Sequence, residues 1–456
     1  MPPVAARRPM PAWRDRGPLL LLLVAIGAIA SVWLRSAPLL ANFAFGDGGL
    51  FWVMANDLRG NGFVPPELTT YNTGDIPWVY PPLGIYLVAI LGGGLDLLRI
   101  LPVVWAVATL PAVWLLAREL IGERGAVVAL VAYGLAGPAY QGLIAGGGVT
   151  RGPGLLLAVL TMWAVVRGNV AGAGVLGGLT LLTHPIAAFY AVLASATLWA
   201  TRGANRRMLA APPIALAIGA AWFVPMIVRH GVAPFTAGAG SRELDLVENL
   251  VTLVADAVNP PNLAFTIGLV GVAVAARRRR WDLLAWLAVS VFGLAVVDRW
   301  MVIPLAVLAG LAVDAVLDQP ARLRSVALLA LAGVSAVTGV ALAHPNETLT
   351  ADERETMAWA ARETAPEATF AVIGYSADRG VVEWFPALSG RVNLTAWQGT
   401  EWLPSGDRRM QATGWANCRA LGCLPDADFY VVRPECCPGL TERLAQVRPA
   451  VHTTGD

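Results

Sequence analysis

The first residue that could do chemistry is Asp47, a carboxylate among glycine and aromatic residues in the segment Phe45 to Trp52, and Asp75 lies further along in the same loop. The loop follows an apolar stretch long enough to cross a membrane. A carboxylate just beyond such a stretch would lie at the boundary between water and lipid, where it could meet a lipid headgroup and a soluble substrate at once. The simpler alternative is that Asp47 only caps a short helix starting near Gly48.

Three basic residues, Arg151, His184 and Arg299, stand in otherwise apolar sequence, where an unpaired charge is expensive and usually functional. Arginine binds phosphate through a two-pronged fork, so Arg151 and Arg299 are candidates for holding a phosphate group. His184 is a candidate for contacting a phosphate or an acceptor. Each has a structural alternative: an ion pair with Asp298 for Arg299, a cytoplasmic anchor for Arg151, and a hydrogen bond to a neighbouring helix for His184.

The tail of the chain holds a second group of aromatic residues with carboxylates. Glu383 and Trp384 begin one such segment, and Gln398 to Trp402 form another, which includes Glu401. Aromatic rings can stack on sugar faces while a carboxylate accepts hydrogen bonds from hydroxyl groups, so both segments are candidates for substrate binding. Large aromatic residues in a small domain more often form its core, and this alternative stays open.

Composition indicates the environment in which these residues lie. The 456-residue chain is 56% hydrophobic and only 14% charged, and its mean hydropathy is +0.60. About a quarter of the residues in a soluble domain are charged, so a water-soluble fold of this length could not bury so much apolar surface. The net charge of +2 is too small to indicate a nucleic-acid partner. We therefore expect an integral membrane protein whose first partner is the lipid bilayer.

Apolar stretches long enough to cross a hydrocarbon core of about 30 Å recur along the first three quarters of the chain. The stretch from Val170 to Ala200 is broken at His184-Pro185 and is expected to form one kinked helix or two shorter ones. We predict 11 to 13 spans. The eleven candidates are Pro18 to Pro38, Pro81 to Leu95, Ile100 to Leu116, Gly125 to Ile144, Gly154 to Val166, Val170 to Ala200, Leu209 to Val228, Leu263 to Ala276, Leu283 to Val297, Trp300 to Leu317 and Ser325 to Ala343.

Clusters of arginine predict which loops face the cytoplasm, because cytoplasmic loops carry an excess of basic residues. The N-terminus is then inside, the loops 39–80 and 229–262 and the C-terminal tail are outside, and the first span is an uncleaved signal anchor in the cell membrane. The loop around Arg118 and Arg124 falls outside if every span is simple, so one early span, around Pro81 to Leu95, is expected to be misread or re-entrant. The clusters are Arg7 to Arg16, Arg202 to Arg207, Arg277 to Arg280 and Arg322 to Arg324.

From His344 onward the apolar pattern stops, and residues 344–456 are long enough for one small domain. A helix over 351–363 and short strands over 368–373 and 429–433 predict an α/β fold. All four cysteines lie in this tail, where an oxidising surrounding favours disulfides over zinc. The predicted fold class is thus a polytopic α-helical membrane domain over residues 1–343, followed by a small C-terminal α/β domain outside the cytoplasm.

Several of these segments resemble the GT-C superfamily of membrane glycosyltransferases, which contains dolichyl-phosphate-mannose protein mannosyltransferases and aminoarabinose transferases. The resemblance is carried by GDGGLFW around Asp47 and by YPPLGIYL from Tyr80. GGGVTRGPG around Arg151, LLTHPIAAF around His184 and DRWMVIPLA from Asp298 are similar to segments of bacterial members. The order of these features covers most of the chain.

The resemblance implies a GT-C-like fold and an enzyme that moves a sugar from a polyprenyl-phosphate donor to a glycan, lipid or protein acceptor at the outer face, with inversion. Asp47 would be the catalytic base that takes the acceptor proton. The roles implied for the other residues are donor-phosphate binding by Arg151, His184 and Arg299, and substrate binding by Asp75, Tyr80, Glu383 and Trp384.

One departure from the family concerns Tyr80, which stands where many relatives carry lysine or histidine before Pro-Pro-Leu. If that cation contacts the donor phosphate, this chain must supply the charge elsewhere, which strengthens the interest in Arg151 and Arg299. Asp47 and Asp75 could together hold a divalent metal, as in the oligosaccharyltransferase branch. Two carboxylates 28 positions apart are no specific metal signal, and we expect no required metal or other cofactor.

Two other classes of protein compete with an enzyme. A transporter or flippase would also have many spans and few buried charges, but such proteins tend to show repeated halves, and the sequence has no convincing internal repeat. The second is a non-catalytic GT-C-like assembly subunit. The early outer loop and the late soluble domain favour an enzyme.

Overall fold

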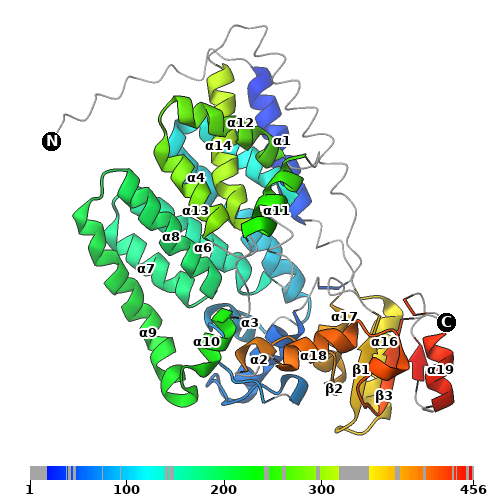
Figure 1. Ribbon diagram of the computed structural model, residues 1–456. Helices are drawn as coiled ribbons and strands as arrows, with labels where there is room; N and C mark the ends of the chain where they lie inside the picture. The colour runs from blue at the N-terminus through cyan, green and yellow to red at the C-terminus, as the bar shows by residue number, and fades with distance from the viewer. Residues whose placement is uncertain are drawn as a thin grey trace.

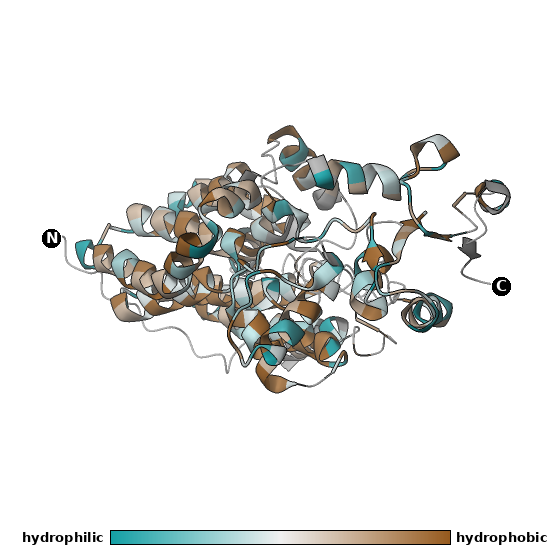
Figure 2. Ribbon diagram, turned by 90° about the horizontal axis from the view of Figure 1, so that it is seen from below, coloured by the Kyte–Doolittle hydropathy of each residue, from teal (hydrophilic) through white to brown (hydrophobic). Residues whose placement is uncertain are grey.

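A computed structural model shows a bundle of apolar helices with a small α/β domain packed against one end (Figure 1). The structure describes residues 18–36, 39, 43–44, 48–73, 75–92, 94–137, 139, 143, 148–240, 246–258, 263–293, 298–317, 349–374, 380–403, 407–433, 436–437, 439–447 and 451–453. Asp47 and the predicted span from Ser325 to Ala343 lie outside these residues. Figure 2 shows brown, apolar residues over most of the bundle.

Within the part of the chain that the structure describes, nine apolar helices build the bundle. Two helical stretches there, Leu97–Leu135 and Arg206–His230, are by length and composition alone able to cross a membrane, and several other apolar helices have 10–17 residues. The bundle helices are α1 (Pro18–Ser36), α4 (Leu97–Leu135), α6 (Arg151–Val166), α7 (Val170–Leu181), α8 (Pro185–Thr201), α9 (Ala211–His230), α12 (Leu263–Arg277), α13 (Trp281–Phe292) and α14 (Asp298–Leu317).

The predicted early outer loop, 39–80, contains the short helix α2 (Gly49–Gly60), and the short helix α3 (Leu83–Leu91) lies in the predicted span that follows the loop. With nine residues, α3 is about 14 Å long, which is half of what a membrane crossing needs. The predicted span from Pro81 to Leu95 is therefore not a simple crossing. The later outer loop likewise contains α10 (Ala233–Gly240) and α11 (Leu246–Val258).

Two breaks in the helices fall where the sequence predicts them. The predicted spans from Ile100 and from Gly125 fall in the two halves of α4, which meet at a kink at Gly122, where φ is +83° and ψ is 173°. This backbone conformation is open to glycine because it has no Cβ atom. The long apolar stretch from Val170 forms two helices, α7 and α8, separated at His184-Pro185. Of the two predicted alternatives, one kinked helix or two shorter helices, the second is therefore confirmed.

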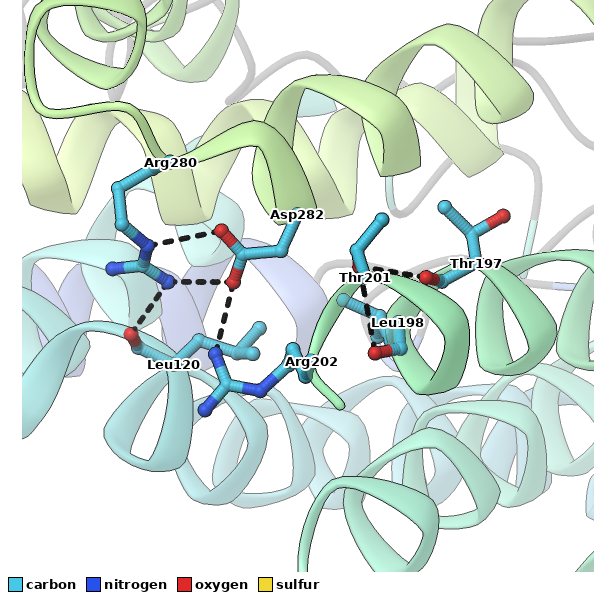
Figure 3. A network of polar contacts seen from close by, with 7 residues as sticks. All are labelled: Leu120, Thr197, Leu198, Thr201, Arg202, Arg280 and Asp282. Atoms are coloured by element: carbon cyan, nitrogen blue, oxygen red, sulfur yellow. Dashed lines mark hydrogen bonds and ion pairs between the residues drawn. The ribbon is translucent and has the colours of Figure 1, made fainter. Parts of the chain in front are cut away.

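The end of the bundle that carries Arg124, Arg202, Arg278 and Arg280, here called the basic end, is held by ion pairs. Asp282 accepts hydrogen bonds from both arginines that flank it in space, with Arg202 Nη1 at 2.9 Å and Arg280 Nη2 at 2.8 Å from Oδ2 (Figure 3). Arg280 also donates to the carbonyl oxygen of Leu120 in α4. These contacts join the kink region of α4 to the C-terminal end of α8 and the N-terminal end of α13.

At the same basic end, Asp314 of α14 pairs with Arg124 at 3.4 Å and with Arg278 at 4.0 Å. The loop around Arg118 and Arg124 therefore lies beside the arginine clusters at 202–207 and 277–280. The sequence placed this loop on the opposite side only if every span was simple, and it gave the span around Pro81 to Leu95 as the one expected to be misread or re-entrant. The short helix α3 in that span agrees with this expectation.

The Asp282 network should make stability depend on pH. Asp282 precedes the apolar stretch that begins at Leu283, and although burial acts to raise its pKa, the hydrogen bonds and charges of Arg280 and Arg202 outweigh burial and lower the pKa. A carboxyl group whose folded pKa is lowered stabilises the protein above its unfolded pKa of about 3.9 and loses that effect as the pH falls through the lowered folded value.

We expect Asp282→Asn to lower the midpoint of thermal unfolding in detergent at pH 7, by the equivalent of about 2 kcal/mol. The difference from the wild type should shrink as the pH is lowered toward 3. Asp96→Asn is the matched control, because the side chain of Asp96 is 76% exposed and pairs only locally with Arg99. A difference that stayed constant from pH 7 to pH 3 would contradict the role given to the ionised carboxylate.

The C-terminal domain is built around four parallel strands in the order β2-β1-β3-β4. The predicted strands over 368–373 and 429–433 are confirmed as β1 and β3, which pair in register from Phe370–Phe429 to Ile373–Val432. The disulfides are Cys418–Cys423 and Cys436–Cys437. The elements are α16 (Ala351–Glu363), β1 (Thr369–Ile373), α17 (Val381–Ser389), β2 (Val392–Asn393), α18 (Asp407–Ala416), β3 (Phe429–Val432), α19 (Leu440–Val447) and β4 (Val451–Thr453).

The domain shares a hydrophobic core with the early outer loop. Phe43 packs edge-on against Trp384 with ring centroids 5.0 Å apart, and both belong to one cluster of buried residues that also includes Phe370 of the sheet. Asn72 of the loop exchanges two hydrogen bonds with the backbone of Asn393, at 3.0 and 2.7 Å. The loop and the domain therefore form a single packed unit at the end of the bundle opposite the basic end.

Candidate active site

A cavity of about 1450 Å³ runs along the bundle from the C-terminal domain toward the basic end. Ordinary small-molecule pockets measure roughly 300–1,000 Å³, so this cavity is large. It extends along α8 from His184 to Trp199, which corresponds to roughly 22 Å of helix. Most of its lining is apolar: the residues include Ala188, Val192 and Trp199 of α8 and Ala215, Leu216 and Phe223 of α9.

The ionisable residues that line the cavity, among those described, gather at the end next to the C-terminal domain. Tyr80, Arg151 and His184, three residues that the sequence analysis singled out, line it together. The hydroxyl groups of Tyr80 and the buried Thr150 lie 3.4 Å apart. The sequence left the side of Arg151 open, and the structure places it at the domain end and away from the basic end.

Local folding explains why Arg151 and His184 meet. Arg151 is the first residue of α6, and His184 is the N-cap of α8, where its Nδ1 atom accepts the backbone N–H of Ala187 at 3.2 Å. The two helices approach closely because Gly154 has no side chain: a Cβ atom there would lie 2.8 Å from the Cβ atom of His184. The N-termini of α6 and α8 therefore converge on the polar end of the cavity.

This arrangement suits an anion. A helix N-terminus carries partial positive charge and unpaired N–H groups, which favour phosphate and other anions. Because Nδ1 of His184 is an acceptor, the proton of the neutral ring lies on Nε2, from which it can be donated. Arg151 adds a full positive charge with a planar fork of donors.

Aromatic rings surround the same end of the cavity. The ring of Tyr80 lies edge-on to Phe51 of α2 at 5.0 Å and to Trp402 at 5.5 Å. Phe235 of α10 meets Trp402 at 6.4 Å. A Cβ atom at Gly238 would come within 2.9 Å of the Trp402 ring, so α10 packs tightly on it. Residues of α2, of α10 and of the C-terminal domain thus enclose the polar end jointly.

Glu383 and Trp384 lie in the core and do not line the cavity. The ring of Trp384 is fully buried. The Glu383 carboxylate accepts hydrogen bonds from the Tyr71 hydroxyl at 2.8 Å and from the backbone N–H groups of Trp397 and Gln398 at 3.0 and 3.2 Å. This location agrees with the core alternative that the sequence left open. Glu383 ties the loop at 397–402 to the early outer loop.

We expect Glu383→Gln to loosen this loop. A glutamine amide has one acceptor oxygen where the carboxylate has two, so at least one backbone N–H loses its partner. Hydrogen exchange at the Trp397 and Gln398 amides should become about tenfold faster or more. Glu355→Gln is the matched control, since Glu355 is exposed and pairs only with Arg362. Unchanged exchange at both amides would contradict the role of Glu383 as a clamp.

The remaining predicted site residues stand apart from this cluster. Asp75 is exposed at a turn with φ +53° and does not line the cavity. The side chain of Arg299 and the whole of Asp47 are outside the part of the chain that the structure describes. Leu50 and Phe51, which follow Asp47 closely in the chain, do line the cavity. Within the described residues, no three His, Cys, Asp or Glu side chains group closely enough to hold a metal ion.

Sequence reasoning understated the loop at 397–402. Trp397, Gln398, Glu401 and Trp402 all line the cavity, and the Gln398 side chain accepts the backbone N–H of Leu50 at 3.3 Å. The carboxylate and aromatic residues of this segment were visible in the sequence. Their distance along the chain from Tyr80 and Arg151 hid the fact that they share one site.

Three solved structures have the same architecture. The apo oligosaccharyltransferase of Archaeoglobus fulgidus matches with a TM-score of 0.62 at 16% identity, over 84% of this chain and 65% of that chain. The same archaeal protein, AglB, in complex with an inhibitory peptide and a dolichol-phosphate, matches with a TM-score of 0.59 at 16% identity over the same shares. ArnT from Cupriavidus metallidurans, bound to undecaprenyl phosphate, matches with a TM-score of 0.56 at 15% identity, over 82% of this chain and 85% of that chain.

No protein-family model and no curated protein sequence matches the chain. The chain spans about 65% of the length of the archaeal oligosaccharyltransferase. At 15–16% identity these structures establish the architecture. They confirm the resemblance that the motifs around Asp47, Tyr80 and Arg151 indicated: the chain has the fold of the GT-C membrane glycosyltransferases.

Proposed function

We propose that the protein is a multi-pass membrane glycosyltransferase that takes a sugar from a polyprenyl-phosphate donor and transfers it, with inversion, to an acceptor at the outer face of the membrane. One observation carries the proposal: a long apolar cavity ends in a cluster of phosphate-binding groups at Arg151 and His184. A polyprenyl phosphate has the same two parts, a long apolar chain and a single anionic headgroup.

The apolar part of the cavity suits a lipid tail because several of the apolar side chains that line it are also exposed on the outside of the bundle. The side chains of Val192 and Leu216, which line the cavity, are 64% and 65% exposed, and Val228 at the end of α9 is 81% exposed. Large exposed apolar surfaces of this kind are rare on soluble proteins and indicate contact with lipid. A polyprenyl chain would enter between α8 and α9 from the membrane.

The distribution of charged groups supports eleven crossings. With α3 outside the membrane and α4 counted as two crossings joined at Gly122, the arginines of the basic end fall on one side and Tyr80, Arg151 and His184 on the other. The positive-inside rule then makes the basic end cytoplasmic. The count is odd when the predicted span from Ser325 is included, so the C-terminal domain is extracytoplasmic.

In the proposed reaction, the oxygen of an acceptor hydroxyl attacks the anomeric carbon while the bond from that carbon to the phosphate oxygen breaks. Asp47 takes the proton of the hydroxyl, and the electron pair of the broken bond leaves with polyprenyl phosphate. Arg151, the Nε2–H group of His184 and the N-termini of α6 and α8 stabilise the charge on the departing phosphate. Arg299 is proposed as a further cation on the phosphate.

The ligands of the neighbouring structures support this choice of donor, since one holds a dolichol-phosphate and another undecaprenyl phosphate. The test is binding by the purified protein in lipid nanodiscs. Undecaprenyl phosphate should bind at least tenfold more tightly than undecaprenol, which has the same chain and no phosphate. Equal affinity for both lipids would contradict a phosphate site at the end of the cavity.

A further inference from the structure

The segment of the C-terminal domain from Trp397 to Trp402 has no role in holding the donor phosphate or in the transfer step described above. It nevertheless lines the same end of the cavity as Tyr80, Arg151 and His184. Among the described residues that line the cavity, Glu401 is the single acidic one. An acidic group is unsuited to a phosphate, but it can accept a hydrogen bond from a hydroxyl group of a substrate.

The indole ring of Trp402 carries a hydrogen-bond donor without a partner in the described part of the chain. Its side chain is 8% exposed and is fixed between Tyr80 and Phe235. Its Nε1–H group has no partner among the described residues. A buried donor without an acceptor is unfavourable, and such groups in binding sites are commonly satisfied by a ligand.

The segment is held rigidly in place. The Glu383 carboxylate accepts hydrogen bonds from the backbone N–H groups of Trp397 and Gln398. The backbone N–H of Trp402 donates to the carbonyl oxygen of Gly399 at 3.1 Å. Gly399 has φ +85° and packs on Ile76, where a Cβ atom would come within 2.8 Å of Cδ1. Side chains on a fixed segment can discriminate between ligands because little ordering is needed on binding.

We propose that Glu401 and Trp402 form the subsite for the sugar carried by the polyprenyl phosphate, an inference that rests on the proposed function. A sugar hydroxyl is both a donor and an acceptor. The Glu401 carboxylate therefore accepts one hydrogen bond from the sugar, and the indole Nε1–H group of Trp402 donates another. The rings of Tyr80 and Trp402 supply apolar surface to the sugar face. The C-terminal domain is thus the part of the chain that determines which sugar is accepted.

The subsite can be tested with undecaprenyl phosphate, undecaprenyl-phosphate mannose and undecaprenyl-phosphate glucose as probes. The wild type should bind at least one of the two sugar-bearing lipids more tightly than undecaprenyl phosphate. Glu401→Gln and Trp402→Phe should each reduce that preference about tenfold. Their affinity for undecaprenyl phosphate itself should stay within about twofold of the wild type, because the phosphate contacts are separate.

The matched controls are Glu355→Gln and Trp359→Phe, which make the same chemical changes in the same domain away from the cavity; Trp359 packs on Phe429. Both should keep the wild-type preference. A wild type that binds neither sugar-bearing lipid better than undecaprenyl phosphate would overturn the subsite. Variants that weaken the binding of all three lipids equally would also overturn the subsite, since the segment from Trp397 to Trp402 would then only close the cavity. Failure of the proposed function is distinct, because it would appear as no preference for undecaprenyl phosphate over undecaprenol.

Discussion

Asp47→Asn should reduce sugar transfer by about 100-fold to 10,000-fold while leaving expression and donor binding unchanged. An asparagine of the same shape cannot take the acceptor proton, and general base catalysis contributes about that factor. Leu50 and Phe51, three and four positions after Asp47 in the sequence, line the cavity. The measurement is the rate of donor consumption at saturating donor and acceptor.

Asp75→Asn provides the comparison for this variant. Asp75 lies in the same outer loop, yet it is exposed and does not line the cavity. We expect its replacement to leave the transfer rate within a few-fold of the wild type. Retained transfer in Asp47→Asn would remove Asp47 as the base, and an equal loss in both variants would point to a role of the loop as a whole.

Arg151→Ala should weaken binding of undecaprenyl phosphate by about 10-fold to 100-fold, which is the size expected for charge-assisted hydrogen bonds. Arg151→Lys should recover part of that loss, because lysine restores the charge without the planar fork. Added salt should reduce the loss of affinity in Arg151→Ala only if water reaches the phosphate site freely. Titration of the purified protein with the lipid in nanodiscs measures all three affinities.

Arg167→Ala is the matched control for this prediction. Arg167 is the C-cap of the same helix, at its other end, and its side chain is 50% exposed. Its removal should leave lipid affinity unchanged. An Arg151→Ala variant with wild-type affinity for undecaprenyl phosphate would show that the phosphate is held elsewhere, with Arg299 as the next candidate.

The sequence was sufficient to predict most helices and the nature of the tail, because apolar length and strand-like runs are local signals. It could not decide whether the segment from Pro81 crosses the membrane. The apolar run there is interrupted by Gly92, which ends α3 in a left-handed conformation, and hydropathy does not register that backbone change. The break at Gly122, in contrast, lies between two spans that the sequence predicts separately.

The site was partly predictable. Tyr80, Arg151 and His184 stood out as unusual residues in apolar sequence, and the structure brings all three to one end of one cavity. What sequence could not supply was long-range contact: Gln398 meets Leu50 across 348 positions, and Trp402 meets Tyr80 across a part of the chain that includes all of α4 to α14. Those contacts depend on how the domain packs on the outer loop.

The most direct test of the central claim is whether purified wild-type protein consumes a polyprenyl-phosphate sugar. The protein in nanodiscs is incubated with undecaprenyl-phosphate hexoses and pentoses and with envelope glycan, lipid and protein fractions as acceptors, and the release of undecaprenyl phosphate is followed by mass spectrometry. We predict that one sugar-bearing lipid is consumed and that its sugar appears on an acceptor with inverted anomeric configuration. Tight binding of undecaprenyl phosphate with no consumption of any donor would contradict the enzyme and favour a carrier or assembly subunit.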